Sequence, residues 1–203
     1  MTPIDSTAAQ PPAEGRARRR RADAERNLSA LLDAAKAVFA ASGVHAPAKE
    51  ITDNAGLGVG TLYRHFPRRA DLVVAVLRHE IDACAEAAAA MRAEHTPYEA
   101  LRQWVSRYVE LVGTKRGLAE ALHSDDQAFA GLRDDVAERL EPVVTELIAD
   151  ALDADEMVAG LDARELLYAI GLLGQPVPAA DIGADYNQRM VAVFMEGLRH
   201  SPN

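Results

Sequence analysis

The sequence has a single cysteine, Cys84, in 203 residues, and it contains no long run of apolar residues. One cysteine excludes an intramolecular disulfide framework and Cys-rich zinc or iron–sulfur sites, a composition typical of proteins in a reducing compartment. No segment approaches the roughly 18 apolar residues that span a bilayer, and the Arg-rich N-terminus lacks the apolar core of a signal peptide. We therefore expect a cytoplasmic globular protein with no membrane association.

Motifs of catalysis and of cofactor binding are also missing. The six histidines are scattered, with no i, i+4 pair and no His/carboxylate metal motif. The closely spaced Gly56, Gly58 and Gly60 follow no predicted strand, so they do not form a phosphate-cradling loop. We expect neither an enzyme nor a bound metal or cofactor.

The charge is distributed unevenly along the chain. The net charge is −9 overall, yet residues 1–70 hold 11 Lys and Arg against 7 Asp and Glu, while residues 71–203 hold 11 against 24. A basic first part indicates nucleic-acid binding, joined to a body that avoids polyanions. A basic disordered tail on an acidic domain is the alternative that charge alone leaves open.

Helical periodicity governs most of the chain. Residues 1–22 contain Pro, Gly and a run of arginines without apolar periodicity, which predicts a disordered basic arm. Apolar residues then recur at three- and four-residue steps, and no strand alternation is found. We predict an all-α protein of about nine helices, with a three-helix domain over residues 23–70 and a helical body over residues 71–203. In the body we expect a short helix at 118–123, and a longer helix that Pro142 should kink or divide.

A helix-turn-helix pattern lies within the basic part. Pro47 suits the first turn of a helix that ends at Gly56, and a short glycine-containing link leads into the hexapeptide TLYRHF at residues 61–66. Leu62 and Phe66, four residues apart, should pack inward. In such a motif the second helix fits the major groove of DNA, and small residues at its N-terminus allow close approach.

The pattern extends well beyond the hexapeptide. It includes DAAxxxFAxxG at residues 33–43, EIxxxAG at residues 50–56 and GTLYRHFP at residues 60–67. These motifs, within residues 26–80, resemble the DNA-binding domain of the tetracycline-repressor (TetR) family of bacterial transcription regulators. Gly58 stands where that family usually has a Ser or Thr helix cap. The resemblance implies a DNA-binding helix-turn-helix followed by a body that binds a small ligand and dimerises.

The resemblance assigns DNA contacts to outward-facing residues. Base-edge or near-base contacts fall on Lys49, Val59, Gly60 and Thr61, and phosphate contacts fall on Tyr63, Arg64, His65 and Arg69. The Tyr63 hydroxyl and the Arg69 guanidinium, at the start of the next helix, also suit a phosphate on chemical grounds. The basic arm resembles a phosphate or minor-groove contact through Arg18, Arg19, Arg20 and Arg21.

Small residues face large aromatic ones early in the body. The segment ACAEAAAAM at residues 83–91 is almost all small, and Trp104 and Tyr108 lie one turn apart on the next predicted helix. Such a pairing can leave a cavity, or it can let two helices pack closely. The candidates for contact with an unidentified small-molecule effector are Cys84, Ala88, Met91, Trp104, Tyr108 and His123. The nearby acids, Glu80, Asp82 and Glu86, are expected on a solvated face.

The last two predicted helices are apolar around most of their circumference. Such helices need partners on two sides, and the end of the chain has few intramolecular neighbours left. We therefore expect an isologous four-helix homodimer interface. It would use Leu166, Leu167, Ile170 and Leu173 on one helix and Met190, Val191, Phe194 and Leu198 on the other.

These observations predict a ligand-responsive transcriptional regulator that binds double-stranded, palindromic operator DNA as a homodimer. By the default of the family it would be a repressor that a small molecule releases from DNA. Two alternatives stay open. The first is a transcriptional activator, and the second is a sequence-neutral architectural DNA-binding protein, against which the acidic body argues.

Overall fold

The computed structural model describes residues 13–117, 127–129, 131–158, 160–175 and 185–199. This part of the chain is all-helical, which confirms the predicted fold class, and it contains no strand beyond an isolated bridge between Met157 and Arg199. The elements are α1 (Ala13–Ser42), α2 (Ala48–Ala55), α3 (Val59–His65), α4 (Arg69–Glu94), α5 (Pro97–Gly117), the 3₁₀-helix η1 (Gln127–Phe129), α7 (Leu132–Asp153), α8 (Ala163–Leu173) and α9 (Tyr186–Leu198). The helix expected at 118–123 lies outside the described residues.

The described residues carry neither a membrane-spanning helix nor a cluster of metal ligands. No helix there is long and apolar enough to cross a membrane. The described residues also contain no group of three or more His, Cys, Asp or Glu side chains close enough together to hold one metal ion.

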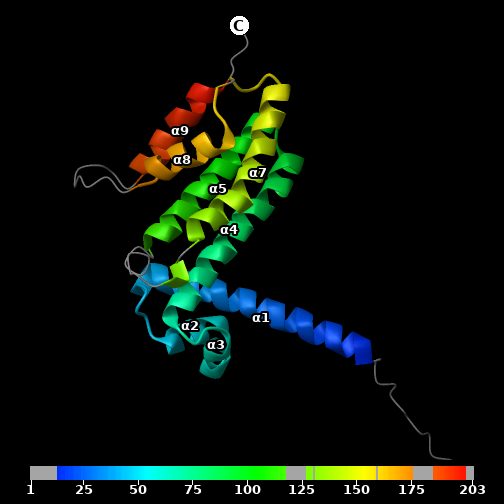
Figure 1. The fold of residues 1–203 in the computed structure, drawn as a ribbon, viewed down its shortest axis with the longest axis vertical. Helices are drawn as coiled ribbons and strands as arrows, with labels where there is room; N and C mark the ends of the chain where they lie inside the picture. Colours follow the sequence, from blue (N-terminus) through cyan, green and yellow to red (C-terminus); the bar gives the residue numbers. More distant parts are fainter. Residues whose placement is uncertain (1–12, 118–126, 130, 159, 176–184, 200–203) are drawn as a thin grey trace, which may run out of the picture.

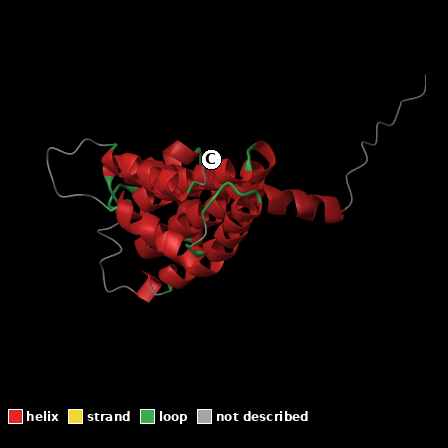
Figure 2. Ribbon diagram, turned by 90° about the horizontal axis from the view of Figure 1, so that it is seen from above, coloured by secondary structure: helices red, strands yellow, loops and turns green. Residues whose placement is uncertain are grey.

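The second half of the predicted disordered arm is helical. α1 begins at Ala13 and runs for 30 residues, so residues 13–22 are the start of a helix. Alanine and arginine are strong helix formers, and the segment continues without interruption into the apolar part of α1 that packs in the core. The N-terminal half of α1 projects away from the rest of the molecule (Figure 1, Figure 2). Exposed on it are Arg18, Arg19 and Arg21.

α4 takes part in two hydrophobic clusters. Its first half packs with α1, α2 and α3 in the N-terminal cluster, to which it contributes Leu72, Val73, Val76 and Leu77. Its second half packs with α5, α7, α8 and α9 in the C-terminal cluster, to which it contributes Ile81, Cys84, Ala85 and Ala88. Figure 1 shows α4 rising from the α2–α3 region into the bundle with α5 and α7. One continuous helix therefore connects the two cores.

Pro142 does not divide α7, which runs as one helix from Leu132 to Asp153. A proline inside a helix removes a hydrogen bond and costs about 3 kcal/mol. Leu140, Val144 and Leu147 are fully buried in the C-terminal cluster on both sides of the proline. Because each such side chain contributes about 1.5–3 kcal/mol on burial, packing outweighs the cost of the proline.

Two glycines shape the turn between α2 and α3. Gly56 ends α2 with φ 66°, in the left-handed region where other residues are strained. Gly58 is the N-cap of α3 and has extended backbone, a position that glycine tolerates without a side-chain bond. Leu62 is buried as predicted and Phe66 is half-buried. The turn therefore leaves the other side of α3 facing solvent.

Candidate nucleic-acid interface and ligand cavity

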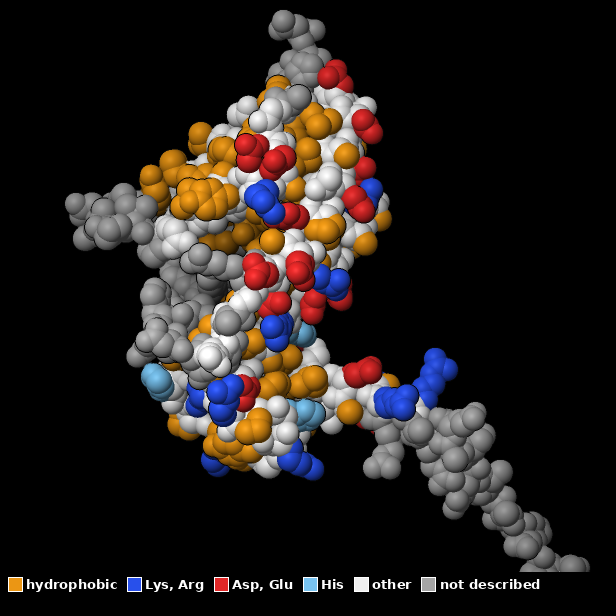
Figure 3. Space-filling view, in the orientation of Figure 1, with side chains coloured by type: hydrophobic (Ala, Val, Ile, Leu, Met, Phe, Trp, Pro, Cys, Tyr) orange, Lys and Arg blue, Asp and Glu red, His pale blue; other side chains and the backbone are white. Residues whose placement is uncertain are grey.

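The solvent-facing side of α3 carries the residues that the sequence predicted for DNA contact. Gly60, Arg64 and His65 are exposed, and so is Tyr63, at 55% of its surface. Val59 and Thr61 are half-buried. On the face shown in Figure 3, most acidic side chains lie over the upper bundle, while Lys and Arg side chains border the lower domain that holds α2 and α3. A tyrosine exposed on this scale has its hydroxyl available for a phosphate oxygen.

Two predicted contact residues bind neighbours on their own helix. Arg64 Nε donates to the Gly60 carbonyl at 3.0 Å, and Arg64 Nη2 donates to the Thr61 hydroxyl at 3.2 Å. On α2, Lys49 Nζ lies 2.6 Å from Asp53 Oδ2. These side chains lie at the surface, where such an ion pair is worth about 1 kcal/mol or less. Exchange of these local partners for phosphate oxygens therefore costs little.

The half-buried Arg69 makes contacts within the N-terminal domain. Its guanidinium donates to the Ala46 carbonyl and lies over the Phe39 ring, 5.5 Å from the centroid. The sequence predicted a phosphate contact for this residue because it opens α4. In the structure it also has a positioning role, since these contacts tie the start of α4 to α1 and to the loop before α2. A phosphate contact would have to use the N–H groups that remain.

The three acids of α4 that were predicted to lie on a solvated face do not share one environment. Asp82 and Glu86 are exposed as predicted, but Glu80 is buried. Its carboxylate is paired with Lys36 of α1 and Arg107 of α5. The sequence does contain a sign that Glu80 is buried. It lies four residues from Val76 and four from Cys84, and therefore on the same face of the helix as these two apolar residues.

The small residues of α4 bring it into close contact with α5. Trp104 is fully buried, its Nε1 donates to the Cys84 carbonyl at 2.9 Å, and its ring stacks on Tyr108 with the centroids 5.6 Å apart. Ala88 is buried beside them, and Met91 packs on the same cluster. Of the two alternatives, close packing is therefore the one observed. Cys84, Ala88, Met91 and Trp104 are core residues, and His123 lies outside the described residues.

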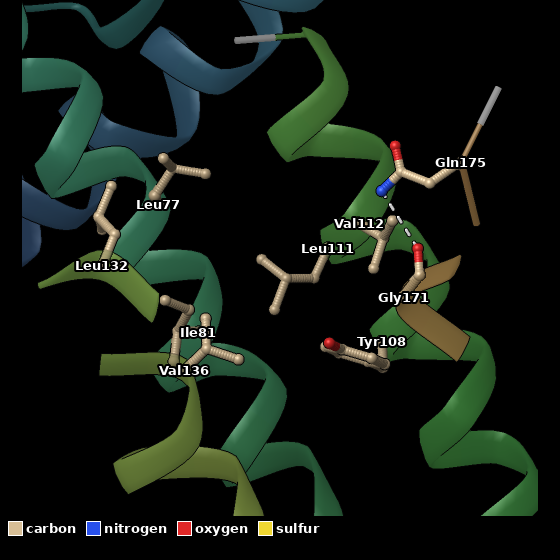
Figure 4. Close-up of a pocket in the computed structure, with 9 residues that line it drawn as sticks. All are labelled: Leu77, Ile81, Tyr108, Leu111, Val112, Leu132, Val136, Gly171 and Gln175. Atoms are coloured by element: carbon tan, nitrogen blue, oxygen red, sulfur yellow. Dashed lines mark hydrogen bonds between the residues drawn. The ribbon is translucent and has the colours of Figure 1, made fainter. Parts of the chain in front are cut away.

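Tyr108 also lines a cavity of about 180 Å³ (Figure 4). Among the described residues of the predicted effector set, Tyr108 is the one that lines it. The other lining residues are Leu77 and Ile81 of α4, Leu111 and Val112 of α5, Leu132 and Val136 of α7, Gly171 of α8, and Gln175. Burial raises the pKa of Tyr108 to about 12, so its hydroxyl stays protonated at neutral pH. The sequence did not single out the aliphatic residues because they are indistinguishable from ordinary core.

The cavity borders both hydrophobic clusters. Leu77 is buried in the N-terminal cluster and Leu132 packs against it. Ile81, Leu111 and Val136 belong to the C-terminal cluster. A molecule in this cavity would therefore touch side chains of both clusters at once.

Half of the residues predicted for a dimer interface lie inside the chain's own core. Leu166, Leu167, Ile170 and Val191 are at most 7% exposed. Leu173, Met190, Phe194 and Leu198 are half-buried. The outer side of α8 and α9, orange in Figure 3, instead exposes Tyr168 at 70%, Leu172 at 56% and Val193 at 65%. A helix that is apolar all round does not reveal in its sequence which side meets the core.

Comparison with known proteins covers both parts of the chain. Residues 31–76 match the family described as bacterial regulatory proteins, tetR family, and residues 96–200 match the C-terminal domain of SbtR-like transcriptional regulators. The HTH-type transcriptional activator FasR of Mycolicibacterium smegmatis is 30% identical over 173 residues, which are 83% of this chain and 77% of FasR.

Solved structures agree with these matches. The TetR transcriptional regulator SCO0520 from Streptomyces coelicolor has a TM-score of 0.69 and 29% identity, over 86% of this chain and 99% of that one. A TetR transcription regulatory protein from Mycobacterium vanbaalenii has a TM-score of 0.67 and 32% identity, over 89% and 99% of the two chains. The chain therefore belongs to the TetR family of transcriptional regulators, which are ligand-responsive DNA-binding proteins and not enzymes.

Proposed function

We propose that this regulator binds a palindromic operator as a homodimer and leaves it when a small molecule fills the cavity beside Tyr108. The observation that carries the proposal is the position of this cavity between the two hydrophobic clusters. A ligand shifts a conformational equilibrium only if it binds one conformation better than the other. The walls of this cavity belong to both hydrophobic clusters, so its shape changes whenever one cluster moves relative to the other. A ligand that fits one of these shapes therefore binds one conformation better than the other.

The DNA contacts would come from α3, α2, the first residue of α4 and the start of α1. Gly60 and the half-buried Val59 and Thr61 support close approach of the N-terminus of α3 to base edges, with Lys49 alongside on α2. Tyr63, Arg64 and His65 would contact phosphates, and so would the remaining N–H groups of Arg69. The arginines of α1 would add charge-based affinity without sequence preference.

The dimer would form through the outer side of α8 and α9. Tyr168, Leu172 and Val193 are large apolar side chains exposed on adjacent helices. A monomer seldom leaves such a patch uncovered, and an isologous contact pairs it with itself. The half-buried Met190 and Phe194 would contribute at its edge. In Figure 1 this side of the molecule lies away from the projecting end of α1, so the partner would not block it.

Repression is the expected mode, and activation is the second candidate because the relative FasR is named an activator. The test begins with the genomic fragments that the pure protein selects. A reporter gene behind the selected promoter, in a host that lacks the protein, is then compared with and without its expression. A fall in reporter signal supports repression, and a rise supports activation. Failure to select any fragment over random DNA would contradict the proposed operator binding.

A further inference from the structure

The walls of the Tyr108 cavity have a uniform chemistry. Six of its nine lining residues are Leu, Ile or Val, and no charged side chain is among them in the part of the chain that the structure describes. The polar side chains are Tyr108 and Gln175 (Figure 4). The Gln175 amide nitrogen already donates to the Gly171 carbonyl at 3.2 Å. The Tyr108 hydroxyl is therefore the main polar group offered to an occupant.

The volume of the cavity limits the size of that occupant. About 180 Å³ is slightly more than the roughly 150 Å³ of an engineered aliphatic cavity that stays dry and binds benzene. One ring with a short substituent, or two fused rings, fits this space. A molecule of four fused rings would extend out of this space or require the walls to move.

The charge of the occupant is limited as well. An ion in an apolar cavity loses its hydration, at a high cost in free energy unless a counter-charge pairs with it. Arg107, which precedes Tyr108, is already paired with Glu80 at 3.2 Å and Glu110 at 2.9 Å. The lining residues that the structure describes thus offer no counter-charge to a carboxylate or an ammonium group.

We propose that the effector is an uncharged molecule of one or two rings with a single hydrogen-bond acceptor, to which the Tyr108 hydroxyl donates. This inference rests on the proposed function, in which the cavity is the effector site. The hydroxyl has no hydrogen-bond partner among the described residues. The stack of Tyr108 on the fully buried Trp104 holds its ring in place before any ligand binds.

Three probes of similar size separate the parts of this proposal. Acetophenone has one ring and a carbonyl acceptor, ethylbenzene has the ring without the acceptor, and benzoate carries a negative charge. Binding to the full-length chain is measured by calorimetric titration at neutral pH, with the emission of Trp104, the only tryptophan in the chain, as a second signal. We expect acetophenone to bind about fivefold more tightly than ethylbenzene, and benzoate not to bind. Benzoate binding as tightly as acetophenone would overturn the proposal.

Tyr108→Phe tests the hydrogen bond alone, because it keeps the ring and its stack on Trp104. Acetophenone should lose its fivefold advantage in this variant, and the affinity of ethylbenzene should not change. An acetophenone affinity unchanged by Tyr108→Phe would overturn the role given to the hydroxyl.

Gly171→Leu tests the location of the site. A Cβ at Gly171 would meet only the Tyr108 hydroxyl, at 3.9 Å, so a larger side chain has room to enter the cavity. The change also replaces a helical glycine by a better helix former, which favours folding. Its control is Gly113→Leu on the exposed side of α5, where a Cβ meets nothing within 4 Å. We expect Gly171→Leu to abolish binding of acetophenone and ethylbenzene, and Gly113→Leu to leave it unchanged.

The inference and the proposed function can fail separately. Selection of DNA and gel-shift titration need no probe, so they report on operator binding alone. If neither acetophenone nor ethylbenzene binds the wild-type chain at millimolar concentration while operator binding is intact, the inference is wrong and DNA-binding regulation stands. If acetophenone binds the wild-type and Gly171→Leu chains equally well, its site lies outside this cavity, and the inference is also wrong.

Discussion

Lys36 Nζ lies 2.6 Å from Glu80 Oε2, and this ion pair joins α1 of the N-terminal domain to the middle of α4. Arg107 Nη2 of α5 approaches the same oxygen at 3.2 Å. Only 2% of the surface of Glu80 is exposed. One buried carboxylate, on the helix that the two cores share, therefore binds a cation from each domain.

Glu80→Gln should destabilise the fold by about 3 kcal/mol, because it removes the buried counter-charge of Lys36 and one of the two carboxylates that pair with Arg107. Urea unfolding followed by circular dichroism measures this change. The control is Asp82→Asn two residues on, whose ion pair with Arg139 is about half exposed, and which should cost less than about 1 kcal/mol. Equal losses in the two variants would show that burial of the Glu80 pair has no special effect.

Tyr63→Phe should weaken binding to operator and to random duplex alike, by about 1 kcal/mol, because it removes one hydrogen bond to a phosphate. Gel-shift titration on both duplexes measures the effect. Tyr186→Phe makes the same chemical change at a half-buried position at the start of α9 and should not alter either affinity. Unchanged affinities in Tyr63→Phe would remove this residue from the DNA interface.

Replacing Arg18, Arg19 and Arg21 by Ala should reduce the salt dependence of DNA binding. Each lost phosphate contact lowers the slope of log K against log salt by about 0.9. Alanine favours helix, so circular dichroism should show α1 intact. Arg139→Ala removes a positive charge from α7 and should leave the slope unchanged. A slope that is equal in the triple variant and the wild type would mean that the start of α1 stays away from DNA.

Val193→Glu should separate the dimer without unfolding the chain. The side chain is 65% exposed in the single chain, but the proposed interface would bury the new charge twice, at a cost of several kcal/mol. Light scattering should report monomers, and operator affinity should fall because the half-sites are no longer bound together. Leu152→Glu on α7 is the exposed apolar control and should stay dimeric. A dimeric Val193→Glu would move the interface elsewhere.

Cys84 should resist alkylation in the folded protein. Burial raises the pKa of its thiol to about 12 from 9.0, so almost no thiolate exists at pH 8.5 and the sulfur is also inaccessible. Iodoacetamide should react only after unfolding in urea. Because the unfolded thiol ionises near pH 9 and the folded one near pH 12, this group should stabilise the fold below pH 9, and that contribution should be lost as the pH rises towards 12. Rapid modification without urea would contradict the packed position of Cys84.

Local rules made the helices and the DNA-binding motif predictable. Periodic apolar residues, the glycines of the turn and the hexapeptide at residues 61–66 act within a few residues of each other, so they can be recognised along the chain. The same rules failed at the start of α1. There, good helix formers continue a packed helix beyond its core contacts, and the absence of apolar periodicity shows only that this part is exposed.

The sequence by itself determined that the chain is helical, which helices form the DNA-binding motif, and which polar side chains α3 can present. Only the tertiary structure decided how the apolar surfaces are shared. The small residues of α4 meet Trp104 instead of a cavity, the cavity opens beyond Tyr108, and Leu166 and Ile170 turn inward while Tyr168 and Leu172 face outward. The reason is that the hydrophobic effect is non-directional: it requires apolar area to be buried, but the choice among apolar partners depends on how all the helices fit together.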